Sequence, residues 1–116
     1  MYYCIKTDIE NKNFHIILDR THERNAVNLP MMLEIGQAVD DAEKAFHAGD
    51  LRVLIVRAEG RVFSQGIDLT ALDDYVELYG DNWRNNLFAT TRTLQEVLTK
   101  LERSSLPSIC LIQGFC

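Results

Sequence analysis

The stretch from Gly60 to Leu69 constrains this chain more than any other. It reads Gly-Arg-Val-Phe-Ser-Gln-Gly-Ile-Asp-Leu and follows the short apolar run Val53–Val56. An apolar, β-branched run of this length predicts a buried strand, and the glycine, serine and aspartate after it predict a loop at the end of that strand. Gly66 has no Cβ, so the main chain can turn sharply there and come close to a bound group. The segment therefore predicts a loop that offers a ligand its backbone N–H and C=O groups.

Two well-known loops do not fit this stretch. A phosphate-binding P-loop has four residues between its glycines and then Lys-Ser/Thr, whereas Gly60 and Gly66 enclose five residues and Ile67 follows. A nucleophile elbow requires Gly-x-Ser-x-Gly, and Val62 stands where the first glycine should be. Ser64 is therefore not expected to act as a nucleophile.

The chain before this loop predicts a hairpin, a polar loop and a helix. Residues 2–10 and 14–19 are expected to form two strands joined by the turn Asn11-Lys12-Asn13, because the second segment alternates apolar and polar positions. Residues 19–28 are polar and lack periodicity, which indicates a loop. Asn28 is a suitable N-cap for a helix that opens at Leu29-Pro30 and ends near His47-Ala48-Gly49. Its apolar positions recur every three or four residues, at Met32, Ile35, Val39, Ala42 and Phe46.

The remainder of the chain predicts alternating strands and helices. A strand is expected over Leu51–Arg57, a short acidic helix or lid over Ala71–Tyr79, and a strand over Ser108–Gln113 that is apolar on both faces and that, without later elements to cover it, is expected to expose apolar area and an unpaired edge. Between them a long helix is expected, capped by Asn85 or Asn86, with its apolar face formed by Leu87, Leu94, Val97, Leu98 and Leu101. The resulting order ββαβαβ predicts an α/β fold in a single domain spanning residues 1–116.

Composition narrows the class of partner. The 116 residues carry a net charge of −5, which disfavours nucleic acid and anionic membrane surfaces as partners. Three separated cysteines without a Cys-x-x-Cys pair suggest neither a disulfide framework nor a zinc site, so no metal is expected. We find no membrane-length apolar run and no signal or transit pattern at the N-terminus, which makes the cytoplasm the expected compartment, with mitochondria and peroxisomes left open.

Three segments together carry a resemblance to a known family. Phe63–Leu69 resembles the Phe-Ser-Ala-Gly-x-Asp-Leu loop of the enoyl-CoA hydratase/isomerase (crotonase) family, and Arg24-Asn25-Ala26-Val27-Asn28 resembles that family's upstream Arg-Asn-Ala-x-Asn segment. Pro107–Cys116 is similar to the strand and turn that lead to the family's glycine-rich second loop. The segment after Leu72 and the helix before Leu106-Pro107 resemble the dienoyl-CoA isomerase branch. The fold that this implies is the N-terminal part of a crotonase-like superhelix of ββα units.

The resemblance also implies a chemistry of the fatty acid β-oxidation type. Family members bind an acyl-CoA thioester and stabilise its enolate in an oxyanion hole formed by two backbone N–H groups, and the CoA thioester is the substrate, so no separate cofactor is implied. The first donor maps onto the N–H of Ile67, placed by Gly66. The CoA-binding positions map onto Arg24, Ala26, Ser64, Gln65, Gly66, Asp68 and Leu69, with Asp68 bracing the loop rather than acting as a base. The family assembles as trimers or hexamers.

Two features depart from the family pattern. Gln65 occupies a position where the family has alanine, and its amide is expected to crowd the adenine site or to donate an extra hydrogen bond. The second oxyanion donor and the acid/base carboxylates of the family would lie beyond Cys116. We therefore expect an N-terminal portion of an acyl-CoA hydratase or isomerase, inactive as this chain alone.

Other interpretations stay open from the sequence. One is a noncatalytic binding module that uses an exposed strand edge, and another is an unrelated doubly wound domain with a flavodoxin-like strand order. Asp73, Asp74 and Glu77 can imitate a pair of catalytic carboxylates, although a charged, solvated helix face is the commoner explanation for such a cluster.

Overall fold

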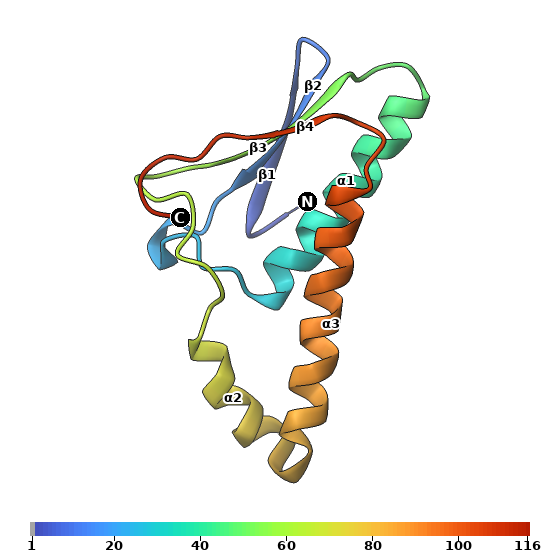
Figure 1. The fold of residues 1–116 in the computed structure, drawn as a ribbon. Helices are drawn as coiled ribbons and strands as arrows, with labels where there is room; N and C mark the ends of the chain where they lie inside the picture. The colour runs from blue at the N-terminus through green and yellow to red at the C-terminus, as the bar shows by residue number, and fades with distance from the viewer. Residues whose placement is uncertain (1) are drawn as a thin grey trace.

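The fold is a twisted sheet with helices on one face, as expected for an α/β chain (Figure 1). The computed structural model describes residues 2–116, apart from the side chains of residues 71–74. Its sheet has the strand order β1-β2-β3-β4, in which β1 and β2 are antiparallel and the other pairs are parallel. The strands are β1 (Ile5–Glu10), β2 (Asn13–Leu18), β3 (Val53–Ala58) and β4 (Ser108–Cys110).

The hairpin of β1 and β2 is confirmed, with a shorter turn than the sequence predicted. Only Asn11 and Lys12 lie between the strands, and their φ angles are 52° and 66°. Two consecutive positive φ angles are typical of the type I′ turn, whose twist matches that of the strands on either side. Asn13 already belongs to β2, where it pairs with Glu10.

The helices form the two parallel crossovers. The first crossover is α1 (Leu29–His47), between β2 and β3, and the second contains α2 (Thr70–Tyr79) and α3 (Trp83–Glu102), between β3 and β4. Figure 1 shows α1 and one end of α3 side by side against the sheet, while α2 and the other end of α3 project from it as a helical hairpin. The loop of residues 63–69 leads from β3 into this hairpin.

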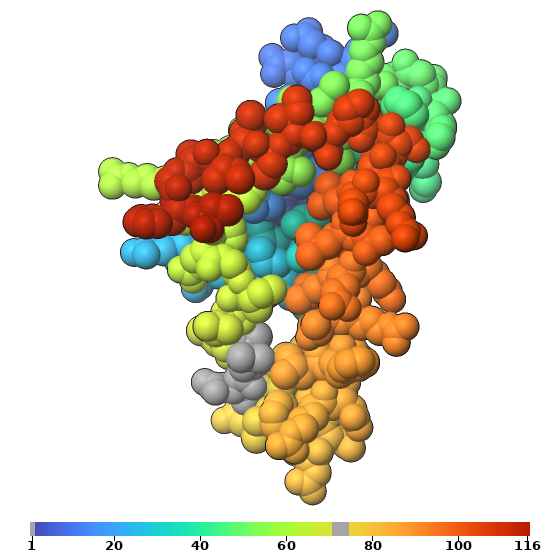
Figure 2. Space-filling view, viewed as in Figure 1, coloured from blue at the N-terminus to red at the C-terminus, as the bar shows by residue number. Residues whose placement is uncertain are grey.

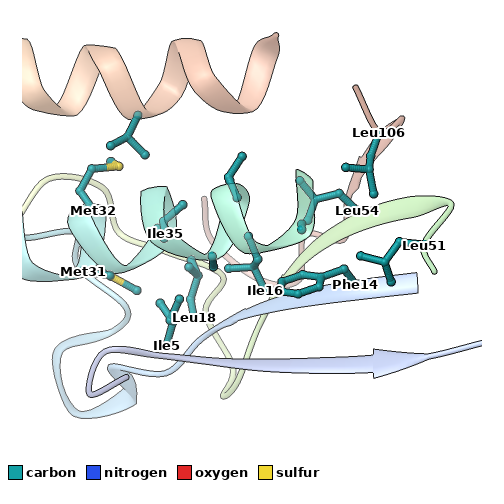
Figure 3. Packing of buried hydrophobic residues seen from close by; sticks show 14 residues of the cluster. Ile5, Phe14, Ile16, Leu18, Met31, Met32, Ile35, Leu51, Leu54 and Leu106 are labelled. Atoms are coloured by element: carbon teal, nitrogen blue, oxygen red, sulfur yellow. The ribbon is translucent and has the colours of Figure 1, made fainter. Parts of the chain in front are cut away.

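The expected cap and apolar face of α1 are confirmed. The side chain of Asn28 accepts a hydrogen bond from the Met31 N–H at 3.0 Å, which satisfies one of the unpaired donors at the start of a helix. The side chains that α1 buries pack against both the sheet and α3, and Figure 3 shows Met31 directed toward the sheet and Met32 directed toward α3. This packing fixes the position of residues 24–28, which lead into α1 and form part of the site described below.

Three expectations at the C-terminal half are wrong. The helix expected after Asn85 or Asn86 begins at Trp83, because the 3-10 turn Gly80–Asn82 runs into it and no side-chain cap is formed. Leu98 belongs to the exposed side of α3, with 55% of its surface accessible, since α1 contacts the face that carries Val97.

The last strand ends at Cys110 instead of Gln113. Beyond Leu111, whose N–H still bonds to Val56, the chain leaves β3, and the Gln113 side chain donates to the carbonyls of Ala58 and Gly60. Ile109, Leu111 and Ile112 are each about half exposed, as expected where no later element within residues 1–116 covers this apolar segment.

Candidate functional site

The two segments singled out in the sequence lie against each other. Val27 and Ile67 form an isolated parallel bridge, in which the Val27 N–H donates to the Gly66 carbonyl at 2.8 Å and the Asp68 N–H donates to the Val27 carbonyl at 2.9 Å. The Gln65 N–H donates to the carbonyl of Arg24 at 3.2 Å. Residues 24–28 and 63–69 therefore form one structural unit at the carboxyl ends of β2 and β3.

The bridge orients the backbone of Ile67. In an extended segment the hydrogen-bonding groups of successive residues point to opposite sides. The groups on either side of Ile67, the Gly66 carbonyl and the Asp68 N–H, both point to Val27, so the Ile67 N–H points away from it. No hydrogen bond joins this N–H to any other residue that the structure describes. Gly66, at φ 95°, provides the turn that this arrangement requires.

The buried side chain of Asn25 joins the loop before α1 to the segment after β3 by hydrogen bonds. Only 1% of its surface is exposed. Its side-chain oxygen accepts the Arg20 N–H at 2.8 Å, and its amide donates to the carbonyls of Glu59 and Val62 at 2.9 Å each. Both amide protons are thereby used, which makes Asn25 a structural residue.

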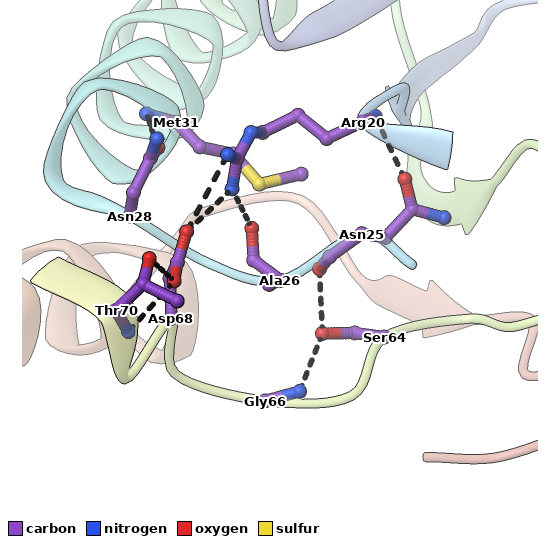
Figure 4. Close-up of polar contacts among 9 residues, drawn as sticks. All are labelled: Arg20, Asn25, Ala26, Asn28, Met31, Ser64, Gly66, Asp68 and Thr70. Atoms are coloured by element: carbon purple, nitrogen blue, oxygen red, sulfur yellow. Dashed lines mark hydrogen bonds and ion pairs between the residues drawn. The ribbon is translucent and has the colours of Figure 1, made fainter. Parts of the chain in front are cut away.

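Ser64 has a structural task as well. Its buried hydroxyl donates to the Asn25 carbonyl at 2.8 Å and accepts the Gly66 N–H at 3.0 Å (Figure 4). The hydroxyl thus holds Gly66 in its turn. Neither a histidine nor a carboxylate is among its hydrogen-bond partners in the described part of the chain, in keeping with the expectation that Ser64 is no nucleophile.

Asp68 braces the loop, as the resemblance implied. Its carboxylate accepts the hydroxyl of Thr70 at 2.6 Å and the Thr70 N–H at 3.1 Å, and it forms an ion pair with the Arg20 guanidinium at 3.4 Å (Figure 4). The hydrogen bond from the Thr70 hydroxyl, followed by the other Thr70 bond and the charge of Arg20, outweighs burial and lowers the pKa of Asp68 below its usual range. A carboxylate held in its ionised form by such partners is a poor general base.

Arg20 is a residue that sequence reasoning missed. Its side chain is 12% exposed and joins the Ala26 carbonyl to Asp68, which lies 48 positions later in the chain. No local pattern around Arg20 distinguishes it from a solvated loop arginine. The Ala26 N–H bonds to Glu23, so both backbone polar groups of Ala26 already make internal hydrogen bonds.

Three of the expected CoA-binding residues line hollows beside the loop. Arg24, Ser64 and Gln65 line a hollow of about 340 Å³, and Arg24 also borders a neighbouring one of about 460 Å³ that contains Arg61. Phe115 lies at both. Leu69 is 68% exposed and stands at the start of α2.

The third segment closes one side of these hollows. The Phe63 N–H donates to the Gln113 carbonyl at 3.0 Å. At Gly114, where φ is 60°, an added Cβ would lie 2.1 Å from the carbonyl oxygen of Arg61. Only glycine allows the two backbones to approach this closely.

An apolar cavity of about 500 Å³ lies on the other side of Ile67. Figure 2 shows an opening between the yellow-green loop residues and the orange α3 in this region. The cavity is lined by Val27, Asn28, Leu29, Pro30, Ile67, Asp68, Tyr75, Leu87, Thr90, Thr91 and Leu94. Its size lies within the range of small-molecule sites. Ser64 and Gln65 of the loop thus line a hollow that also contains Arg24, and Ile67 and Asp68 line the apolar cavity.

The acidic cluster of residues 73–77 is described only in part. The side chains of Asp73 and Asp74 lie outside the described residues, and Glu77 is exposed on α2. Within the part of the chain that the structure describes, no group of three or more potential ligands is placed to hold a metal ion, and no helix is both long and apolar enough to cross a membrane.

Comparison with known proteins gives a consistent result. The sequence model of one family, described as enoyl-CoA hydratase/isomerase, matches residues 14–116. The chain is 26% identical over 117 residues to the peroxisomal Delta(3,5)-Delta(2,4)-dienoyl-CoA isomerase of Arabidopsis thaliana, a match that covers 97% of this chain and 41% of the relative. It is 31% identical over 101 residues to the mitochondrial enoyl-CoA hydratase domain-containing protein 3 of Mus musculus, covering 86% of this chain and 30% of the relative.

Solved structures agree on the fold. An enoyl-CoA hydratase/isomerase from Xanthobacter autotrophicus Py2 superimposes with a TM-score of 0.82 at 26% identity, and the match covers 98% of this chain and 40% of that one. An enoyl-CoA hydratase from Shewanella pealeana gives a TM-score of 0.82 at 23% identity, covering 97% and 40%. The expected fold is confirmed, and the alternative of a flavodoxin-like domain is wrong, since the strand order is β1-β2-β3-β4.

Proposed function

We propose, from the premise that the chain belongs to the enoyl-CoA hydratase/isomerase family, that its residues 63–69 bind the carbonyl oxygen of an acyl-CoA thioester through the Ile67 N–H. The observation that carries the proposal is this N–H itself. It points away from Val27, has no hydrogen-bond partner among the described residues, and belongs to a residue that lines the apolar cavity.

The chemistry that this donor supports is enolate stabilisation. When a proton leaves or joins the carbon next to the thioester, negative charge develops on the carbonyl oxygen, and a fixed N–H lowers the energy of that state. Removing one such donor typically lowers kcat by a factor on the order of a hundred to a thousand. The hydrogen bonds of Ser64, Asn25 and Asp68 keep the loop from rearranging as the charge develops.

The two sides of the loop suit the two ends of the substrate. The CoA portion is assigned to the hollows beside Arg24, where Arg24 and Arg61 provide local positive charge despite the net charge of −5. Gln65, which replaces the family alanine, is assigned to the adenine end. The acyl portion is assigned to the apolar cavity, whose burial of hydrocarbon favours binding.

The remaining parts of the active site are assigned to a longer protein. The chain spans about 41% and 30% of the two curated relatives described above. We propose that the second N–H donor and the acid/base carboxylates lie outside residues 1–116, that this polypeptide alone does not turn over crotonyl-CoA, and that the whole protein is a trimer or hexamer. The relatives include a peroxisomal and a mitochondrial protein, so the cytoplasmic compartment stays a prediction.

The experiment measures the polarisation of the thioester by the loop. Crotonyl-CoA labelled with ¹³C at the carbonyl carbon is titrated with the chain, and a downfield shift of the bound carbonyl signal is expected. Replacing the Ile67 amide by a backbone ester removes the N–H without changing the side chain and is expected to abolish the shift.

A backbone ester at Asp68 serves as the control. It removes the N–H that donates to Val27 and loosens the same bridge, but it leaves the Ile67 donor in place. The shift is expected to persist there. Bound crotonyl-CoA without a shift, or with a shift that survives the Ile67 ester, would overturn the proposal.

A noncatalytic binding module is the second candidate. The observation that favours it is the exposure of Ile109, Leu111 and Ile112, at 50%, 49% and 56%, on and after the last strand of the sheet. Failure of the chain to bind any acyl-CoA would favour this candidate over the first.

A further inference from the structure

Two hydroxyl groups meet at the helical wall of the apolar cavity. Tyr75 lies on α2 and Thr90 on α3, and the Tyr75 hydroxyl donates to Thr90 Oγ1 at 2.5 Å. The hydrogen bond between them is partly buried, and both residues line the cavity that Ile67 also lines. This hydrogen bond joins the two helices of the projecting hairpin.

One of the two hydroxyl protons of Tyr75 and Thr90 is not used in the hydrogen bond between them. Two hydroxyls carry two protons, and the bond between them uses one, whichever group donates. Threonines nearby on α3 use their protons within the helix, since Thr91 donates to the Leu87 carbonyl at 2.9 Å and Thr93 to the Ala89 carbonyl at 3.1 Å. Thr90 makes no such bond to a described residue.

Two side-chain acceptors that line the cavity, those of Asn28 and Asp68, already accept hydrogen bonds from other residues. The Asn28 oxygen accepts the Met31 N–H, and the Asp68 carboxylate accepts from Thr70 and Arg20. The remaining proton of the hydroxyl pair is therefore available to a ligand. An unsubstituted alkyl chain that fills the cavity displaces the water bound to this O–H group and provides no acceptor in its place. An oxygen atom on the chain can accept the hydrogen bond that the water had accepted.

We infer that Tyr75 and Thr90 are specificity-determining residues that select an acyl group bearing a hydroxyl or oxo substituent away from the thioester. The inference rests on the proposed function, because it takes the cavity to be the acyl site. One neutral hydrogen bond regained on binding corresponds to roughly threefold to tenfold tighter binding. A site built to hydrogen-bond a substrate oxygen discriminates against the analogue that lacks it.

The test compares matched thioesters. Octanoyl-CoA and the four octanoyl-CoA derivatives hydroxylated at carbon 5, 6, 7 or 8 are titrated calorimetrically into the chain. At least one hydroxylated derivative is expected to bind roughly threefold to tenfold more tightly than octanoyl-CoA. If octanoyl-CoA binds and no derivative binds more tightly, the inference fails while the proposed function stands. If none of the five binds, the proposed function fails.

Isosteric variants assign the preference to the pair. Tyr75→Phe and Thr90→Val each leave one hydroxyl, so each is expected to keep part of the preference, and the double variant is expected to lose it while still binding octanoyl-CoA. Thr93→Val is the matched control, because the Thr93 hydroxyl donates its proton to the Ala89 carbonyl within α3 and Thr93 does not line the cavity. A preference that survives in the double variant, or disappears in Thr93→Val, would overturn the assignment. The measurement on the unaltered chain decides the inference even if the double variant does not fold.

Discussion

Replacing Gly66 by valine tests whether the turn of the loop places the Ile67 donor. Gly66 has φ 95°, a conformation that a β-branched residue disfavours by about 1–3 kcal/mol. An added Cβ meets no atom within 4 Å, so the perturbation is one of backbone conformation and not of collision. Because small domains are stable by about 5–15 kcal/mol, the variant is expected to fold with a free energy of unfolding lowered by about 1–3 kcal/mol.

The backbone strain of Gly66→Val is expected to displace the Ile67 N–H, because the loop can relieve this strain only by changing its conformation. A return of Gly66 toward negative φ disturbs its carbonyl bond to Val27 and its N–H bond to Ser64, and it turns the adjacent Ile67 N–H out of position. Losing this hydrogen bond to the thioester corresponds to roughly threefold to tenfold weaker binding of crotonyl-CoA. In a protein that performs the full reaction, the loss in kcat is expected to be on the order of a hundredfold to a thousandfold.

The chain provides a matched control at Gly49. This residue follows α1, has φ 85°, and likewise has no atom within 4 Å of an added Cβ. Gly49→Val should therefore lower the free energy of unfolding in urea by a similar amount while leaving crotonyl-CoA affinity at the parent value. The reasoning is refuted if Gly66→Val binds crotonyl-CoA as tightly as the parent, or if Gly49→Val weakens binding equally.

Three further outcomes are expected. The lowered pKa of Asp68 means that its ionised form favours the folded state, so its contribution is present above the unfolded pKa of about 4 and is lost as the pH falls through the folded value. Asp68→Asn should lower the free energy of unfolding by about 1–3 kcal/mol at pH 7 by leaving Arg20 without its charge partner, and by less at pH 3; a pH-independent difference in urea titrations would contradict this. Ser64→Ala should destabilise the chain by about 1–3 kcal/mol, because it leaves the buried Asn25 carbonyl unpaired and removes the acceptor of the Gly66 N–H, whereas an unchanged urea midpoint would remove Ser64 from the bracing of the loop. Gly114→Ala should push residue 114 away from the Arg61 carbonyl and raise hydrogen exchange at the Phe63 N–H by roughly tenfold or more, and unchanged exchange would show that the segment accommodates a Cβ.

Much of the fold could be predicted from local sequence. The N-cap at Asn28, the apolar face of α1 and the hairpin around Asn11 depend on residues within a few positions of one another. Caps, helical periodicity and turn conformations are set by such short-range contacts, which the order of residues displays directly. The glycine at position 66 likewise indicated the left-handed turn that the structure contains.

The connections between distant segments were decided only by the tertiary structure. Arg20 pairs with Asp68 across 48 positions, Asn25 bonds to the carbonyl of Val62 across 37, and Tyr75 reaches Thr90 from a different helix. Arg20, Tyr75 and Thr90 read as ordinary polar residues in their own segments, and the sequence did not indicate which residues Asn25 and Asp68 would contact. The partner of each side chain is chosen by the path of the chain through the sheet, since a hydrogen bond forms wherever packing brings a donor and an acceptor to about 3 Å, whatever their separation in sequence.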